Sequence, residues 1–356
     1  MGAVRSVPRS LGELTPAWLT DAIAARCPGA VVGKLVVGEI EDGTNRRARV
    51  EVGYDEGDGP PAVFVKIHGR PAHRGALVAL GALTTEARLA RSGVSLPLAH
   101  PLPFAAAIDR SRLRTIVVMD DVTEVDGRPN DAVTPLSVDE VRDGLAGLAA
   151  LHASYWDRPL PESLGFLRPW RLKRRWAPVS AANLTRGIAK LRRTDLAGLA
   201  DQLSVRMLER EFRSSASLAA SGPMTVLHGD PHPGNTYSLP RRRTGFLDWQ
   251  LARTGNWSHD VGYFVVSSLT PADRRSHDRE LMAGYVEALR DAGVASAPSE
   301  ADAWERYRAT PAYGLGTWLH TFAAGSFQRV DTCLESIRRF AVAYDDLDTK
   351  RSLVAD

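Results

Sequence analysis

The stretch 226–236, Val-Leu-His-Gly-Asp-Pro-His-Pro-Gly-Asn-Thr, constrains the fold more than any other part of the sequence. One Asp, two His and one Asn lie within positions 228–235, and a second Asp, Asp248, follows the apolar run 245–247. Apolar residues on both sides indicate short strands, whereas the Gly and Pro residues between them indicate a loop. The sequence therefore predicts a polar site on loops that short strands hold in place.

The spacing of these polar residues predicts a particular chemistry. Four residues separate Asp230 from Asn235, as in catalytic loops in which the Asp accepts a hydroxyl proton and the Asn holds Mg²⁺. Asp248 stands where a second metal-binding carboxylate is needed. We interpret Asp230 as a candidate catalytic residue, and Asn235 and Asp248 as candidate metal ligands.

Length and charge narrow the range of partners. With 356 residues, of which 44% are hydrophobic and 24% charged, the chain can form two modest domains or one large bilobed domain. The formal net charge is only +3, and the basic runs 171–175, 192–193 and 241–243 lack regularly interleaved aromatic residues. This pattern favours solvated faces over a nucleic-acid surface, so we expect no nucleic-acid partner.

Cysteine use and hydropathy indicate a compartment. Cys27 and Cys333 are far apart and form neither a CxxC pair nor a disulfide framework, which is typical of a reducing compartment. The segment 1–16 has no apolar core, and no run approaches the roughly eighteen consecutive apolar residues of a membrane-spanning helix. We therefore expect a cytoplasmic monomer or homodimer without membrane association.

The first third of the chain alternates between strand and helix patterns. Thr15, followed by Pro, predicts the start of a short helix. The alternating run 63–67 predicts a strand with Lys66 on its polar face, and the helical pattern at 76–91 contains Glu86. Together these patterns predict a small, mostly antiparallel sheet with one inserted helix. Further strands are expected at 35–37, 48–54, 104–108 and 113–119.

The rest of the chain is mainly helical. The polar segment 123–136 marks a boundary, so we expect an N-terminal lobe at 1–122 and a C-terminal lobe at 123–356. A capping box at 137–140 predicts a helix start, and an apolar stripe within 196–212 predicts one further helix. The predicted fold class is α+β and bilobal, with a small sheet lobe and a larger helical lobe. Other helices are expected at 261–269, 271–291, 301–324 and 331–344.

Lys66 and Glu86 indicate how phosphates would be held. An ion pair between them would present the ammonium to the α and β phosphates of a nucleotide, beneath the backbone N–H groups of the turn Gly43, Thr44 and Asn45. Singly, each signal is weak, because a strand lysine is usually a solvated charge and such a turn is usually only a turn. Their order along the chain is what indicates a phosphate site.

Five segments carry a resemblance to a known family: 63–66, 85–89, 117–121, 228–235 and 247–249. On these segments the chain resembles the aminoglycoside phosphotransferase, choline kinase and ecdysteroid-kinase-like superfamily, which shares the protein-kinase bilobal fold. The resemblance extends over about residues 30–345. The motifs at 151–156 and 248–250 are most similar to the ecdysteroid-kinase-like branch.

This resemblance implies a role for each matching residue. Asp230 would be the catalytic base, and Asn235 and Asp248 would hold Mg²⁺. Lys66 would contact the phosphates of ATP or GTP, and Glu86 would orient Lys66. The backbone at the end of the strand before the lobe boundary would contact the adenine, at Met119, Asp120 and Val122.

Two departures from protein kinases limit what the resemblance implies. The turn at 41–45 has one glycine in place of a G-x-G-x-x-G loop, which leaves open which N–H groups meet the phosphates. Trp249 and Gln250 replace the Phe-Gly that follows the metal-binding Asp of protein kinases, and no Ala-Pro-Glu follows. This second departure argues against protein-kinase regulation and against a peptide substrate.

Four other polar residues have structural interpretations. We expect His228 to fix the loop through hydrogen bonds to backbone, and His152 to be a hydrogen-bonded core residue. Asp260 would cap a helix or brace the loop. For His232 two roles stay open, packing of the loop and shaping of the site.

The leading hypothesis is an ATP- and Mg²⁺-dependent phosphotransferase that moves the γ-phosphoryl group to a hydroxyl of a small molecule. The acceptor would be an aminoglycoside-, sugar-, choline- or steroid-like alcohol. The carboxylates at 345–348 could meet a polycationic acceptor, although such a cluster is usually solvent-facing. The alternatives are a kinase-like module that binds a ligand without turnover, and a metallophosphoesterase, for which Thr236 stands where a His should follow Asn235.

Overall fold

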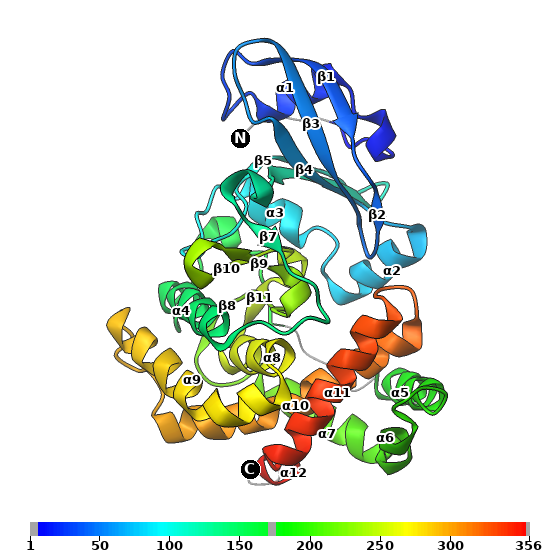
Figure 1. Cartoon of the computed structure of the whole chain (residues 1–356), viewed down its shortest axis with the longest axis vertical. Coiled ribbons are helices and arrows are strands. Elements are labelled where there is room, and N and C mark those ends of the chain that lie inside the picture. Colours follow the sequence, from blue (N-terminus) through cyan, green and yellow to red (C-terminus); the bar gives the residue numbers. More distant parts are fainter. Residues whose placement is uncertain (1–5, 170–175, 354–356) are drawn as a thin grey trace.

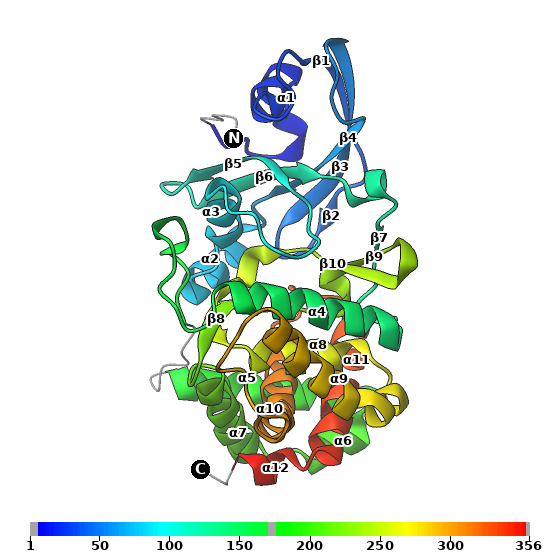
Figure 2. The ribbon, with the colours of Figure 1, turned by 90° about the vertical axis from the view of Figure 1, so that its left-hand side faces the viewer.

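The computed structural model describes residues 6–169 and 176–353, so the basic run 171–175 lies outside the described residues. An antiparallel sheet forms one end of the molecule and a group of helices forms the other, stacked along the long axis (Figure 1). The view turned by 90° shows the same division (Figure 2). The expected α+β fold, with a sheet lobe and a larger helical lobe, is confirmed.

The N-terminal sheet is antiparallel throughout. Its strands run in the order β1-β3-β4-β6-β5, and β2 pairs with the first two residues of β3. The pairing is sequential along the chain except that β6 lies between β4 and β5, which places β4 and β6 at the centre. The strands are β1 (Val31–Val37), β2 (Glu41–Asp42), β3 (Arg46–Glu56), β4 (Ala62–Ile67), β5 (Pro103–Asp109) and β6 (Arg114–Asp120).

The alternation of side chains along β4 separates two cores. Val63 and Val65 are fully buried in an apolar cluster that includes Leu19 of α1 (Pro16–Ile23). Phe64 lies on the opposite face, packed against the alanines of α3 (Thr85–Arg91). Lys66 follows on that same face because successive strand residues point to opposite sides. The strand pattern therefore aims the lysine at α3, as predicted.

The helical pattern at 76–91 forms two helices, and the expectation of one inserted helix is wrong. Gly81 has φ 73° and ends α2 (Pro71–Leu80) in a left-handed cap. The N–H of Gly81 donates to the Val78 carbonyl, and that of Ala82 donates to the Leu77 carbonyl. Such a cap terminates a helix, so α3 begins anew at Thr85. The helical periodicity of the sequence continues across Gly81, so the sequence alone did not predict the end of α2 there.

The helical lobe follows the predicted caps closely. The Ser137 and Glu140 side chains form the expected capping box at the start of α4, and the Thr270 side chain caps α9. Arg192 and Arg242, from two of the basic runs, are ion-paired at the surface with Asp201 and Asp139. The helices are α4 (Val138–Ser154), α5 (Ala177–Leu191), α6 (Ala197–Gln202), α7 (Val205–Leu218), α8 (Ser258–Ser268), α9 (Pro271–Asp291), α10 (Glu300–Ala324), α11 (Val330–Asp346) and α12 (Thr349–Ser352).

The single helix expected over 196–212 is also wrong. Leu203 and Ser204 have extended backbone, with ψ of 128° and 118°, and they separate α6 from α7. Serine competes for backbone hydrogen bonds in non-helical conformations, which favours a helix start at this position. The apolar stripe is continuous in sequence but lies on two helices.

Short strands lie between the N-terminal sheet and the helices (Figure 1). Strand β8 pairs with β11, and β9 lies between β10 and β7, all antiparallel. Within the described residues, no helix is both long enough and apolar enough to cross a membrane. The strands are β7 (Arg128–Pro129), β8 (Met224–Leu227), β9 (Thr236–Leu239), β10 (Arg243–Phe246) and β11 (Arg253–Asn256).

Candidate active site

Two polar loops meet where the short strands end. The loop 228–235 connects β8 to β9, and Leu247 and Asp248 follow β10, the antiparallel partner of β9. The Leu247 N–H donates to the Asn235 carbonyl over 2.7 Å. Strand pairing therefore brings Asp248 next to Asn235, although twelve residues separate them in sequence.

A buried carboxylate braces the first loop. Asp260 lies in the first turn of α8, fully buried, and accepts hydrogen bonds from the N–H groups of His228 (2.6 Å) and Gly229 (3.0 Å). Burial alone would raise its pKa, but hydrogen bonding and charge interaction with His152 lower the pKa of Asp260 to about 2. The expected bracing role of Asp260 is confirmed.

The two interior histidines behave as structural residues. His152 is fully buried, with its ring nitrogens 2.7 Å from the Tyr285 hydroxyl and 3.4 Å from Asp260. The Nε2 of His228 lies 2.8 Å from the Leu247 carbonyl, and its Nδ1 accepts from the Asp230 N–H over 3.3 Å. His228 therefore donates to one loop and accepts from the other, which fixes their relative position, as predicted.

His232 combines the two roles that the sequence left open. The ring is buried and stands edge-on to Trp318, with 5.5 Å between ring centroids. Its Nε2 also lies 3.8 Å from Asp230 Oδ2, and neither ring nitrogen has a hydrogen-bond partner among the described residues. Burial lowers the pKa of His232, which favours an uncharged ring beside Asp230.

Asp230 is a partly exposed carboxylate within this rigid loop. Its side chain is 26% exposed. The Asn235 amide nitrogen donates to the Asp230 carbonyl (3.0 Å) and to its carboxylate (3.2 Å). The pKa of the neighbouring Tyr263 rises well above its usual value because the side chain is buried and because the Asp230 charge lies beside it. The carboxylate is thus held in place while one side stays open to solvent.

Lys66 lies between two carboxylates. Its Nζ is 2.7 Å from Glu86 and 2.5 Å from Asp248, and its side chain is 7% exposed. Glu86 also accepts from the Trp249 N–H over 3.2 Å. Burial opposes the charge of Lys66, but the two neighbouring carboxylates outweigh it and raise the pKa of the ammonium. The predicted Lys66–Glu86 pair is confirmed, and its link to Asp248 was not foreseen.

Asp248 has a backbone conformation that favours glycine. Its φ is 60° and its ψ is 71°, and its carboxylate accepts from the N–H of Gln250 over 3.3 Å. Asp tolerates this left-handed region because its short side chain bonds to nearby backbone. The carboxylate is consequently aimed at Lys66 by a local turn, and Lys66 lowers its pKa against the opposing effect of burial.

The turn 43–45 reaches this site through a side chain. The Asn45 amide donates to the Gln250 side-chain oxygen over 2.8 Å, which connects the N-terminal sheet to the segment after Asp248. The N–H of Gly43 donates to the Asn45 carbonyl within the turn, so that group is already used. Thr44 lies between them at the tip. The sequence predicted backbone contacts here and missed the Asn45–Gln250 bond.

At the end of β6, some backbone groups already form hydrogen bonds within the protein. The Asp120 N–H donates to the Leu102 carbonyl over 3.0 Å, and the Asp120 carboxylate pairs with Arg26 over 2.8 Å. Met119 is buried against α3, and the Val122 carbonyl accepts from Gly127. Of the predicted adenine contacts, the N–H of Asp120 is therefore engaged within the sheet lobe.

The side-chain oxygens of Asn235 and Asp248 suit a hard cation that takes most of its ligands from water and phosphate. The Asn235 amide nitrogen donates to Asp230, so the amide oxygen is the atom that a metal ion could use. Asp248 contributes carboxylate oxygen and is 25% exposed. The described part of the chain contains no cluster of three or more His, Cys, Asp or Glu side chains suited to a metal. Two protein oxygens completed by water and phosphate match Mg²⁺.

The comparisons with known proteins assign this chain to a family. The profile of the phosphotransferase enzyme family matches residues 37–309, which is more than half of the chain. The chain belongs to this family. It is accordingly a small-molecule kinase, as predicted. A search of curated proteins found no match to this phosphotransferase.

Solved structures share the fold of this phosphotransferase. A candidate aminoglycoside phosphotransferase from Ralstonia eutropha has a TM-score of 0.54 at 15% identity, over 93% of this chain and 98% of that one. Choline kinase from Cryptosporidium parvum has a TM-score of 0.55 at 11% identity, over 90% and 91% of the two chains. Plasmodium vivax ethanolamine kinase has a TM-score of 0.50 at 11% identity, over 87% and 81%.

Beneath the loop of the phosphotransferase lies a cluster that the sequence did not reveal. Arg253 Nη2 is 2.6 Å from His259 Nε2, 3.3 Å from the Tyr313 hydroxyl and 3.5 Å from the Gly229 carbonyl. Burial, and then the charge of Arg253, lower the pKa of His259 to about 3, so its neutral ring accepts from the guanidinium. Nothing in the local sequence marks Arg253 as different from a surface arginine.

One carboxylate of the acidic C-terminal segment, Asp346, is engaged in ion pairs. Asp346 pairs with Arg274 and with Arg275, the latter over 2.7 Å. Three tryptophans of the helical lobe are core residues: Trp156 and Trp318 are buried, and Trp304 packs against the main core.

Proposed function

We propose that the protein transfers the γ-phosphoryl group of ATP or GTP, with Mg²⁺, to a hydroxyl of a small molecule. One observation carries this proposal. Lys66 of the sheet lobe pairs with Glu86 and Asp248, and Asp248 follows β10, whose partner β9 begins directly after the loop that carries Asp230 and Asn235. A buried cation, two candidate metal ligands and the partly exposed carboxylate of Asp230 therefore lie on connected segments, which supports the proposal.

Phosphoryl transfer in this class depends on positioning and charge neutralisation. Lys66 would contact the α and β phosphates while Glu86 keeps its ammonium in place. The turn Gly43, Thr44 and Asn45 would lie over the phosphates, tied to the lower lobe through Gln250. The adenine would meet the backbone at Met119, Asp120 and Val122, chiefly through groups other than the Asp120 N–H.

Asp230 would orient the acceptor hydroxyl and accept its proton. It is partly exposed, whereas the neighbouring carboxylate Asp260 is fully buried and occupied by backbone N–H groups. Asn235 and Asp248 would hold Mg²⁺ through their oxygens. When bound, the ion would neutralise the phosphate charge that builds up during transfer.

We place the nucleotide lobe at 1–122 and the catalytic and acceptor lobe at 123–356. One apolar core draws its buried members from residues 11–118. Among the described residues, the buried members of the largest core come from after residue 123 except for Leu89 and Leu96. The acceptor site would be built from 123–220 and from residues after Asp260. Cytoplasmic location and a monomeric or homodimeric state are part of this proposal.

For the acceptor we propose an alcohol of the steroid, choline, sugar or aminoglycoside type, with the ecdysteroid-kinase-like motifs favouring the first. The pairing of Asp346 with Arg274 and Arg275 removes one carboxylate that a polycationic acceptor would need. A neutral or singly charged alcohol is therefore favoured over an aminoglycoside.

The test is transfer from γ-labelled ATP to a panel of these alcohols, with each product analysed by mass spectrometry. A gain of one phosphate supports the proposal, whereas a gain of AMP indicates nucleotide transfer. Nucleotide binding with no transfer to any acceptor or to water would favour a non-catalytic module. Hydrolysis of phosphate esters without ATP would indicate a phosphoesterase.

A further inference from the structure

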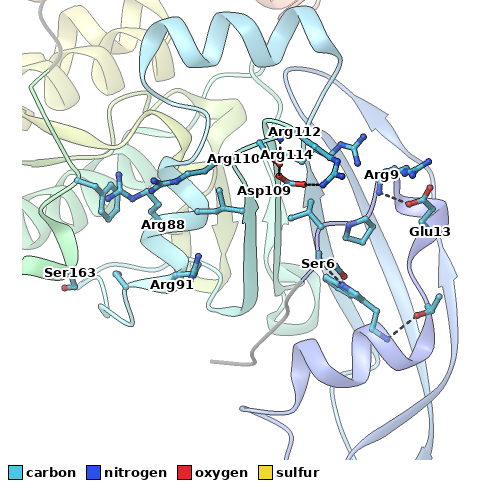
Figure 3. A pocket seen from close by; sticks show the side chains of 18 of the residues that line it. Ser6, Arg9, Glu13, Arg88, Arg91, Asp109, Arg110, Arg112, Arg114 and Ser163 are labelled. Carbon is cyan, nitrogen blue, oxygen red and sulfur yellow. Dashed lines mark hydrogen bonds and ion pairs between the residues drawn. The ribbon is translucent and has the colours of Figure 1, made fainter.

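A cleft of about 1200 Å³ opens beside α3, outside the candidate active site. Four parts of the chain form its walls: the N-terminal segment 6–18, the C-terminal half of α3, the β5–β6 hairpin, and the segment 162–166. Figure 3 shows Arg88, Arg91 and Ser163 at one side of this cleft and Arg9 and Glu13 at the other. Its volume matches or exceeds that of common small-molecule sites.

The cleft is strongly basic. Six arginines and three carboxylates line it. The arginines come from three parts of the chain, the N-terminal segment, α3 and the β5–β6 hairpin, which the fold brings to one cleft (Figure 3). They are Arg9, Arg88, Arg91, Arg110, Arg112 and Arg114.

Two of the carboxylates are already bound by their own neighbours. Glu13 accepts from the backbone N–H of Arg9 over 2.8 Å. Asp109 accepts from the Ser111 hydroxyl (2.6 Å) and the Arg112 guanidinium (3.1 Å), which together hold the pKa of Asp109 at about 2. With Glu162 as the third carboxylate, six arginines and three carboxylates leave a formal charge of +3 in the cleft.

Most of the guanidinium groups have no counter-charge. Within residues 6–169 and 176–353, Arg88, Arg91 and Arg110 form no ion pair, and the buried Nε of Arg114 has no hydrogen-bond partner. The Arg88 guanidinium lies over the Phe166 ring at 4.3 Å. Burial, followed by the charges of neighbouring arginines, lowers the pKa of Arg88. The like charges repel one another, so their convergence costs free energy unless an anion joins them.

Helix α3 separates the cleft from the candidate active site. Glu86, at its start, points to Lys66, and Arg88 lies two positions later. Two helical positions correspond to about 200° of rotation, so the two side chains leave opposite faces of the helix. An anion in the cleft would consequently occupy a second site, distinct from that of the nucleotide phosphates.

We propose that this cleft binds a small polyanion, a molecule with two or more phosphate or carboxylate groups. Guanidinium groups match these groups in a planar, bidentate geometry. The concave walls from four chain segments fit a compact anion better than the extended backbone of a nucleic acid or the flat surface of a membrane. The proposal requires neither turnover nor an assigned acceptor.

Calorimetric titration with inorganic tripolyphosphate tests the proposal. The variant Arg110→Gln/Arg112→Gln removes two charges from the cleft at exposed hairpin positions, and Arg206→Gln/Arg210→Gln removes two exposed charges from α7 as the matched control. Any binding of tripolyphosphate at the nucleotide site is common to both variants. The difference between them therefore reports on the cleft alone.

We expect wild type and control to bind tripolyphosphate at the cleft with equal affinity, and the cleft variant to bind there about tenfold more weakly or not at all. Rising salt should weaken this binding in the wild type. Equal isotherms for the cleft variant and its control would overturn the proposal, as would absence of cleft binding in the wild type. Both variants change exposed side chains, and equal thermal melting would show that each is folded.

Discussion

At the scale of single residues, the site depends on how three carboxylates are used differently. Asp260 is fully buried and accepts two backbone N–H groups, whereas Asp248 faces Lys66. Asp230 remains partly exposed beside the neutral ring of His232. All three residues are aspartates, so their surroundings distinguish them. Asp260 braces the loop, Asp248 is a candidate metal ligand, and Asp230 is the candidate base.

Asp230→Asn should lower kcat roughly a hundredfold to ten-thousandfold, because the amide cannot accept the hydroxyl proton. Nucleotide affinity should change little, since Lys66 and Asp248 are untouched. Steady-state kinetics with the best acceptor measures the first quantity and calorimetry with ATP the second. Asp291→Asn, at the exposed end of α9, is the matched control and should retain full activity. Activity of Asp230→Asn equal to that control would refute the assigned role.

At the scale of elements, short strand pairs and helix α8 position the loop. Strands β8 and β11 hold its first end, β9 and β10 its second, and Asp260 at the start of α8 ties its first residues down. Gly229 has φ 88°, and a Cβ atom there would lie 2.1 Å from the Leu251 carbonyl oxygen. The loop is therefore specified by backbone geometry as well as by side chains.

Gly229→Ala should destabilise the protein by more than the roughly 1–2 kcal/mol that a left-handed backbone costs a non-glycine residue, because the added methyl also meets Leu251. Gly293→Ala is a suitable control, because its φ is 85° and an added methyl would have nothing within 4 Å. Gly293→Ala should lower the free energy of unfolding only by the conformational contribution. Urea unfolding of both variants gives the comparison, and equal losses would show that the Leu251 contact has no effect.

Because of Asp260, the free energy of unfolding should depend on pH in the acidic range. Its folded pKa of about 2 lies below the ordinary value of 3.8, so the stabilisation is complete above pH 4 and is lost as the pH falls toward 2. The contribution is about 2 kcal/mol. In unfolding experiments from pH 5 to 2, Asp260→Asn should show a shallower decline than wild type. Parallel curves would contradict this prediction.

At the scale of the whole molecule, the two lobes share apolar contacts through Leu89 and Leu96, and polar side chains also link them beside the candidate site. Lys66 and Glu86 come from the sheet lobe and Asp248 from the helical lobe, and Asn45 contacts Gln250 across the same gap. A nucleotide bound between the lobes would add contacts to both. These bonds link the two lobes beside the proposed phosphate site.

Asn45→Ala should weaken nucleotide binding about twofold to tenfold, the range expected for loss of one hydrogen bond. Gln250→Ala should have a similar effect, and the double variant should be no worse than either single one because both remove the same bond. Calorimetry with ATP measures all three. Additive losses would show that the two side chains act independently.

Local sequence predicted the features that depend on neighbours along the chain. The caps at Thr15 and Ser137, the face of β4 that carries Lys66, and the loop 228–235 were all recognisable, because caps and strand alternation depend on near neighbours. The same local information failed at Gly81 and at 203–204, where a break in backbone conformation interrupts an apolar pattern that continues in sequence.

Only the tertiary structure decided which distant groups meet. The sequence by itself determined the site residues on the loop and the lysine on its strand, through motif spacing and periodicity. The second carboxylate on Lys66, the Asn45–Gln250 bond, the Arg253 cluster and the basic cleft join segments far apart in the chain. Such contacts depend on how sheet, helices and short strands pack, and no local pattern encodes that packing.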